Sequence, residues 1–182
     1  ALEWALLDPE RVAAVATLAA SGRHSPWCLV WSEAQRQALR ADPRYRDGDY
    51  DPADPPTAGL AAARSIAMVS YRSAESLARR VARQPPAAGL GECAPVPADF
   101  AAQARQRPQG RARVERIDAN SYRILLEAMD THDLARGRGD YEDVLRGIRQ
   151  PVLVGSIASD ALYVPGEQRE LAREIPHVTF LT

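Results

Sequence analysis

Hydrophobic positions change their spacing several times along the chain. Leu2, Ala5 and Leu6 recur at helical spacing, and Pro9 interrupts the pattern because proline disfavours helix in the residue before it. Residues 12–20 are almost continuously apolar and have the length of a strand buried on both faces of a parallel sheet. A helix that leads directly into a buried strand predicts a βαβ connection whose first strand lies outside these residues.

Helical spacing begins at residue 25 and dominates the middle of the chain. Segment 26–42 predicts a helix with Ser25 as N-cap and Pro26 in its first turn. Further helices are predicted over 57–71, 73–83 and 120–130. The predicted apolar stripe of helix 26–42 consists of Trp27, Val30, Trp31, Ala34 and Ala38. That of helix 120–130 consists of Tyr122, Leu125, Leu126 and Met129.

The end of the chain returns to alternating strands and helices. Residues 151–159 predict a buried strand, 166–175 a helix and 177–182 a second strand, whereas 84–99 are rich in proline and glycine and predict a surface loop. The pattern indicates an α/β fold in which residues 1–20 and 149–182 form the sheet core. Residues 21–148 form a helical lid over the strand ends, where open α/β sheets bind ligands.

Composition narrows the class of protein. The chain of 182 residues has 23 basic and 24 acidic side chains, so no overall charge draws it towards nucleic acid or a membrane surface. Cys28 and Cys93 lack the spacing of a metal or redox motif and suit free thiols in a reducing compartment. No apolar run reaches the roughly 20 residues of a membrane span, and no basic leader is present. These features predict a cytoplasmic protein without a nucleic-acid or membrane partner.

Candidate metal sites are weak. The acidic stretch 47–54 resembles a calcium loop, but Pro52 replaces the required glycine and Ala58 the bidentate glutamate. The histidines His24, His132 and His177 have no ligand partner at helical spacing, so no metal is expected. The basic segment 104–118 has no interleaved aromatic residues and is predicted to be a solvated surface.

Arg64 and Tyr71 are candidate substrate-binding residues. They lie seven positions apart in a helix of small and apolar residues, which places them two turns apart on one face. A guanidinium there suits a carboxylate ligand, with the phenol as a neighbouring hydrogen-bond donor. The alternative is a surface arginine paired with Glu75 or Asp130.

Asp160 is the candidate catalytic residue. It follows a buried strand at the carboxyl edge of the predicted sheet, where an acid can hold the histidine of a Ser-His-Asp triad. The alternatives are an Asx turn or an N-cap. The chain has no GxSxG serine, and after Asp160 the one histidine is His177, at a strand start. The triad is therefore incomplete in this sequence.

Several longer motifs resemble a known family. "ALEWALLDPERV", "RHSPWCLVWSEAQRQAL", "DPRYRDGDY", "PPTAGLAAARSIAMVSYRS", "ERIDANSYRILLEAMDTHDLARGRG" and "SDALYVPGEQ" are similar, in this order, to homoserine O-acetyltransferases of the α/β-hydrolase superfamily. The resemblance implies a catalytic serine shortly before Ala1 and a catalytic histidine after Thr182. It matches Asp160 to the family's acid, Arg64 to its substrate-contacting arginine and Tyr71 to the tyrosine two turns on.

The resemblance also implies a reaction. Family members move an acetyl group from acetyl-CoA, a co-substrate, to the side-chain hydroxyl of homoserine. The reaction has a ping-pong mechanism and belongs to methionine biosynthesis. The resemblance further implies that no cofactor is permanently bound and that the lid helices form a homodimer. The segment "AAQARQRPQG" departs from the family pattern at Pro108. Alternatives are a sister acyltransferase that uses succinyl-CoA, serine or deacetylcephalosporin C, or a non-catalytic helical dimerisation module. Without serine and histidine, the chain alone is expected to be inactive.

Overall fold

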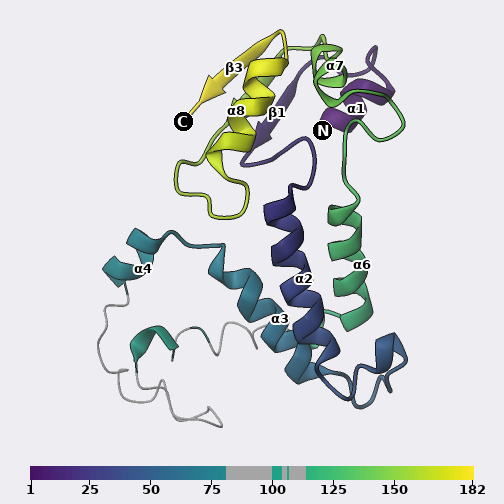
Figure 1. The fold of residues 1–182 in the computed structure, drawn as a ribbon, viewed down its shortest axis with the longest axis vertical. Coiled ribbons are helices and arrows are strands. Elements are labelled where there is room, and N and C mark those ends of the chain that lie inside the picture. Colours follow the sequence, from purple (N-terminus) through teal and green to yellow (C-terminus); the bar gives the residue numbers. More distant parts are fainter. Residues whose placement is uncertain (81–99, 104–105, 107–113) are drawn as a thin grey trace. The chain divides into compact units, whose positions relative to one another are not determined.

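The computed structural model describes residues 1–80, 100–103, 106 and 114–182, and the ribbon is shown in Figure 1. Residues 84–99, Cys93, Pro108 and most of the basic segment therefore lie outside the described residues. The elements are, in chain order, α1 (Leu2–Leu7), β1 (Val15–Leu18), α2 (Pro26–Arg40), η1 (Arg46–Gly48), α3 (Thr57–Val69), α4 (Ala74–Arg80), η2 (Val114–Arg116), α6 (Ala119–Asp130), α7 (Tyr141–Arg146), β2 (Val152–Gly155), α8 (Pro165–Glu174) and β3 (Val178–Leu181).

Two compact units divide the chain. Unit 1 consists of Ala1–Leu29 together with Ala128–Thr182, and unit 2 of Val30–Glu127. Each unit has its own cluster of buried apolar side chains, one around the sheet and one among the helices of unit 2. No helix in the described part of the chain is both long enough and apolar enough to cross a lipid bilayer.

The sheet of unit 1 is parallel and has the strand order β1-β2-β3. Val152 of β2 pairs with Val15 on one side and with Val178 on the other. Leu171 of α8 is buried in the same cluster as Val152 and Val154, and Figure 1 shows α8 lying against the sheet. The predicted strands, and the helix between the last two of them, are thus found.

The expectation that the first strand is buried on both faces is wrong for this chain. In β1, Val15 and Thr17 are buried, whereas Ala16 is exposed and Leu18 is 69% exposed. The apolar run is longer than the strand, which covers four residues. The continuous run of apolar residues predicted that both faces of this strand are buried, but the described residues cover only one face of β1.

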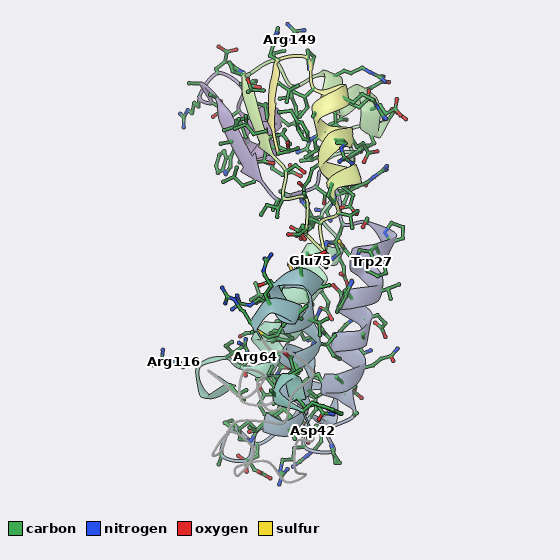
Figure 2. The ribbon with its side chains drawn as sticks, turned by 90° about the vertical axis from the view of Figure 1, so that its left-hand side faces the viewer. Trp27, Asp42, Arg64, Glu75, Arg116 and Arg149 are labelled. Carbon is green, nitrogen blue, oxygen red and sulfur yellow. The ribbon has the colours of Figure 1, made fainter. Side chains whose placement is uncertain are left out.

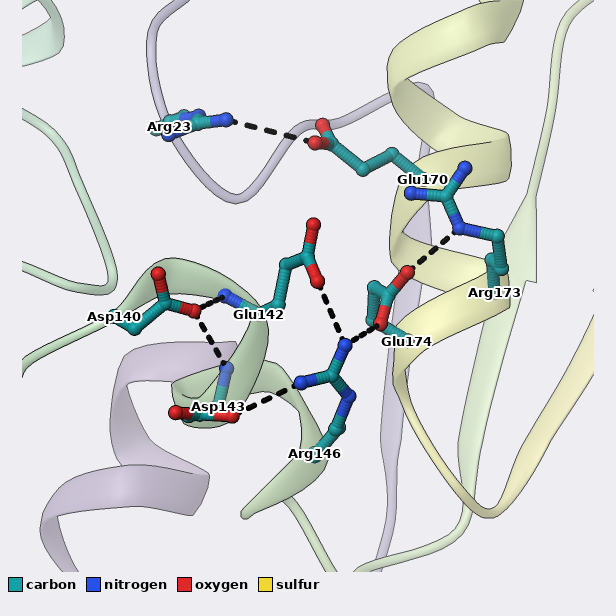
Figure 3. A network of polar contacts seen from close by, with 8 residues as sticks. All are labelled: Arg23, Asp140, Glu142, Asp143, Arg146, Glu170, Arg173 and Glu174. Atoms are coloured by element: carbon teal, nitrogen blue, oxygen red, sulfur yellow. Dashed lines mark hydrogen bonds and ion pairs between the residues drawn. The ribbon is translucent and has the colours of Figure 1, made fainter.

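Helix α7 was not predicted, although its sequence carries clear helix signals. Asp140 is its N-cap and accepts hydrogen bonds from the backbone N–H groups of Glu142 and Asp143, and Gly147 ends it. Arg146 then connects α7 to α8, because its guanidinium contacts Glu142 and Asp143 on its own helix and Glu174 on α8 (Figure 3). Hydrogen bonds from Arg173 and Arg146 lower the pKa of the Glu174 carboxyl.

Unit 2 is built on helices that pack around a cluster of apolar side chains of mixed size. Helices α2 and α6 lie side by side (Figure 1), joined by a hydrogen bond of 2.5 Å from the Tyr122 hydroxyl to Gln35 Oε1. The buried residues of the cluster are Leu39, Tyr45, Leu60, Ala63, Val114 and Ala119. The backbone N–H of Gly59, near the start of α3, donates to Asp42 Oδ2 at 2.8 Å.

The predicted apolar stripe of α2 is only partly buried: Trp31, Ala34 and Ala38 are half-buried, and Ala38 packs against the cluster. The buried positions of this helix are Cys28, Ser32, Gln35 and Leu39. By contrast, Trp27 is 50% exposed and Val30 is also exposed. In α6, Leu126 is buried as predicted, while Leu125 and Met129 are exposed. Polar Gln35 is buried because Tyr122 and the Trp31 carbonyl satisfy its amide, which a rule based on hydrophobicity alone cannot anticipate.

Candidate active site

Asp160 lies beyond the carboxyl end of β2, as the sequence predicts. Its Oδ1 accepts hydrogen bonds from the backbone N–H groups of Leu162 at 2.9 Å and Tyr163 at 3.0 Å, which is an Asx-turn geometry. The N-cap position of α8 is occupied by Val164, so Asp160 is not the cap of that helix. Among the described residues no donor bonds Oδ2. The turn therefore fixes the carboxylate through one oxygen and leaves the other for a further partner.

Three side chains hold the loop around Asp160, which we call the acid loop (residues 156–164). Gln168 of α8 is fully buried; its Oε1 accepts from the Ile157 N–H at 3.1 Å and its Nε2 donates to the Tyr163 carbonyl at 2.5 Å. Trp27 and Cys28, in the first turn of α2, donate to the carbonyls of Ala161 and Leu162. Sequence reasoning missed all three as contributors to the site, because their partners are distant in sequence or are backbone atoms.

The three histidines of unit 1 lie in two places, with His132 beside His24, whose backbone N–H donates to the His132 carbonyl at 3.0 Å. The carbonyl of His177 accepts from the N–H of Val152, the first residue of β2, so His177 lies at the opposite edge of the sheet from Asp160. His24 Nε2 lies 3.5 Å from Asp130 Oδ1, and its ring packs edge-on against Tyr163. The assignment of Asp160 as the acid of a triad stays a prediction.

Arg64 lies on α3 in unit 2 (Figure 2). The residue is half-buried, and its Nε atom is buried without a hydrogen-bond partner among the described residues. The predicted alternative, an ion pair with Glu75 or Asp130, is not found among the described residues, and Asp130 lies beside His24 instead. A buried N–H without a hydrogen-bond partner is costly, and a carboxylate ligand is the chemistry that would satisfy it.

Tyr71 does not share an uninterrupted helical face with Arg64. Helix α3 ends at Val69, and Tyr71 lies in the following turn with 66% of its surface exposed. The expectation of two turns on one helix is therefore wrong, because the chain leaves the helix at Ser70. Tyr71 and Arg64 nevertheless share a neighbour, since the charges of both act on the hydroxyl of Tyr122.

Tyr122 is the residue of this neighbourhood that sequence reasoning assigned to packing alone. The pKa of Tyr122 is raised to about 12, chiefly by burial and to a smaller extent by Tyr71, while the charge of Arg64 opposes the shift. Its hydroxyl stays protonated at neutral pH and donates to Gln35. Unit 2 thus carries Arg64, Tyr71 and Tyr122, whereas Asp160 belongs to unit 1.

The thiol of Cys28 is buried and free, and burial raises its pKa. It is therefore a neutral hydrogen-bond donor at neutral pH rather than a nucleophile. In the described part of the chain, no group of three or more His, Cys, Asp and Glu side chains is arranged to hold a metal ion.

Comparison with known proteins connects these features to a family. The sequence profile described as alpha/beta hydrolase fold matches residues 1–182. Homoserine O-acetyltransferases are similar in sequence. The enzyme of Trichormus variabilis is 51% identical, and the match covers 96% of this chain and 46% of the relative. The enzyme of Chlorobium chlorochromatii is 49% identical, and the match covers 99% of this chain and 49% of the relative. The chain spans about half the length of these curated relatives.

Solved structures show the same fold. Homoserine O-acetyltransferase from Bacillus anthracis superposes with a TM-score of 0.82 at 18% identity, over 98% of this chain and 49% of the other. Esterase E22 superposes with a TM-score of 0.83, also at 18% identity, over 100% and 50%. The predicted resemblance to homoserine O-acetyltransferases and the predicted α/β-hydrolase fold are confirmed, and the chain belongs to the alpha/beta hydrolase fold family.

Proposed function

We propose that this chain is the central part of an enzyme that moves an acetyl group from acetyl-CoA to the side-chain hydroxyl of L-homoserine. The observation that carries the proposal is the position of Asp160 beyond β2, with one carboxylate oxygen left open, in a chain about half identical to proteins named homoserine O-acetyltransferase. A carboxylate in this position supports a Ser-His-Asp mechanism.

In this mechanism the serine and the histidine come from outside residues 1–182. The serine attacks the thioester carbonyl of acetyl-CoA, the thiol of CoA leaves, and the hydroxyl of homoserine then attacks the acetyl-serine to release O-acetylhomoserine. Asp160 holds the histidine in the required tautomer and stabilises the imidazolium that forms in each half-reaction. Its Oδ1 is occupied by two backbone donors, so Oδ2 is the oxygen assigned to the histidine.

Arg64 is proposed to bind the carboxylate of homoserine. The buried, unpartnered Nε supports this role, because the guanidinium gains a charged partner when the substrate arrives. Tyr71 is proposed as a second contact, supported by its place beside Tyr122 in the neighbourhood of Arg64. The helices between β1 and β2, apart from α7, which packs into the cluster around the sheet, are proposed to form the lid. The lid excludes water from the acetyl-serine and provides the contact of a homodimer. A cytoplasmic location is part of the same proposal.

A mass measurement on the complete protein tests this function. Incubation with acetyl-CoA is expected to add one acetyl group to the intact protein, and addition of L-homoserine is expected to remove it and yield O-acetylhomoserine. The Asp160→Asn variant is expected to lose at least about a thousandfold in the rate of acetylation, because the histidine loses its orienting partner.

The same experiment separates the competing functions. Acylation by succinyl-CoA but not acetyl-CoA would replace the proposed donor, and removal of the acetyl group by serine or deacetylcephalosporin C but not homoserine would replace the acceptor. A protein that is never acylated would contradict the enzyme assignment and favour the dimerisation module.

A further inference from the structure

Two peptide groups of the acid loop lie between Asp160 and the first turn of α2. The peptide group that joins Ala161 to Leu162 accepts a hydrogen bond from Trp27 Nε1 at its oxygen (2.8 Å) and donates from its nitrogen to Asp160 Oδ1 (2.9 Å). The next peptide group accepts from Cys28 Sγ at the Leu162 oxygen (3.4 Å) and donates from the Tyr163 nitrogen to the same Oδ1 (3.0 Å). Each side chain of α2 thus reaches the carboxylate through one peptide group.

The coupling has a direct physical basis. A peptide group whose oxygen accepts a hydrogen bond is polarised, and its N–H becomes a stronger donor. Both N–H groups here donate to a carboxylate, the type of hydrogen bond in which donor strength matters most. The two bonds from α2 also fix the orientation of both peptide planes, and therefore the direction in which Asp160 is held.

The first turn of α2 is itself well anchored. The backbone N–H of Cys28 donates to the Ser25 hydroxyl at 3.3 Å, so Ser25 caps the helix as the sequence predicts, and Pro26 occupies the first helical position. Cys28 has no exposed surface. Trp27 and Cys28 are thus presented from a capped helix end, which makes their hydrogen bonds to the acid loop suitable for holding it in one conformation.

We propose that Trp27 and Cys28 are positioning residues for Asp160 and act on its carboxylate through the two peptide groups of the acid loop. This inference rests on the proposed role of Asp160 as the acid of the triad. Neither side chain contacts substrate or the reacting atoms in this scheme. Their effect is on how firmly, and at which angle, Asp160 holds the histidine.

The test uses Trp27→Phe, Cys28→Ala and Cys28→Ser in the complete protein, each also combined with Asp160→Asn. Arg149→Ala is the control, because Arg149 belongs to the same unit, is exposed and has no ion pair within the described residues. Two rates are measured between pH 5 and 9: acetylation by acetyl-CoA, and hydrolysis of p-nitrophenyl acetate, which needs the triad but not homoserine.

Trp27→Phe and Cys28→Ala are expected to slow both reactions about ten- to a hundredfold through misplacement of the acid. The acidic limb of the pH profile should also move to lower pH, because a displaced carboxylate stabilises the imidazolium less. Cys28→Ser retains a donor and should recover most of the rate, while Arg149→Ala should leave rate and profile unchanged. In the Asp160→Asn background, Trp27→Phe should change the rate by less than about twofold.

An unshifted acidic limb, or an equal loss with and without the Asp160 carboxylate, would show that Trp27 and Cys28 are merely structural and would overturn the inference. If wild-type protein hydrolyses p-nitrophenyl acetate but is not acetylated by acetyl-CoA, the proposed function fails while the variants still decide the positioning role. Wild-type protein without either reaction would overturn both.

Discussion

Arg64 shows how a half-buried charge indicates a ligand. Its Nε atom is buried, and no described residue bonds it or neutralises the guanidinium. Tyr122 beside it is held protonated, since burial raises its pKa to about 12. A positive charge next to neutral hydroxyls provides an environment that favours an anion over a cation.

We predict that replacing Arg64 separates the two half-reactions. Arg64→Ala should raise the KM for homoserine at least about tenfold, because a charge-assisted contact contributes about 1.5–3 kcal/mol, and Arg64→Lys should recover only part of it since the fork geometry is lost. Acetylation by acetyl-CoA should be unaffected. Steady-state kinetics with varied homoserine, alongside single-turnover acetylation, measures both.

Arg149→Ala is the control for this prediction, because Arg149 is exposed and has no ion pair within the described residues. It should leave both half-reactions unchanged. Equal losses in acetylation and in homoserine transfer for Arg64→Ala would assign Arg64 to the structure of unit 2 instead of to the substrate.

At the scale of elements, the contact between α2 and α3 depends on a residue without a side chain. A Cβ at Gly59 would lie 2.7 Å from Asp42 Cβ and 2.8 Å from the Leu39 carbonyl oxygen. The backbone N–H of Gly59 also donates to Asp42 Oδ2. The start of α3 can therefore approach the end of α2 only because position 59 is glycine.

Gly59→Ala is expected to destabilise the protein by about 1–3 kcal/mol, since the clash involves backbone and cannot be relieved by a rotamer change. Gly166→Ala is the matched substitution in α8, where nothing lies within 4 Å of the new Cβ. It should be neutral or stabilise by less than about 1 kcal/mol. Urea unfolding followed by circular dichroism compares the two. A smaller loss for Gly59→Ala than for Gly166→Ala would contradict the close approach.

The order of helices and strands was largely predictable from the sequence, whereas the face that each helix buries was not. Periodicity located α2, α3, α6 and all three strands, and Ser25 was correctly identified as a cap. Periodicity placed the buried stripe of α2 on Trp27 and Val30, although Ser32 and Gln35 are the buried positions. Polar residues become buried when a partner far along the chain satisfies them, as Tyr122 does for Gln35, and local sequence does not reveal such partners.

In the candidate site, the position of Asp160 was predictable from the sequence, but its hydrogen-bond partners were not. Asp160 was located because an acid directly after an apolar strand has few possible positions in an α/β sheet. Its connection to Trp27 spans 134 residues and depends on the fold as a whole. The exit of the chain from α3 before Tyr71 was likewise not visible, since no proline or glycine marks the end of that helix.

For the whole molecule, the two clusters of buried apolar side chains predict two separable losses of stability. Leu145→Ala removes a fully buried side chain from unit 1, and Leu39→Ala one that is 1% exposed from unit 2. Each is expected to cost about 2–5 kcal/mol. Hydrogen exchange should show lost amide protection mainly in the unit that carries the substitution. Uniform loss across both units for either variant would contradict the division.

The continuity of unit 2 has a consequence for the order of assembly. Val15 pairs directly with Val152, so β1 and β2 can pair only when the long intervening chain has brought these two residues together. Residues 30–127 form one uninterrupted segment with a core of its own, in which Tyr122 ties α6 to α2, whereas unit 1 is assembled from two separated segments. Prior folding of this segment shortens the loop that β1–β2 pairing must close and lowers its entropic cost by about 1 kcal/mol. The helices are thus expected to form first and the sheet that carries Asp160 last.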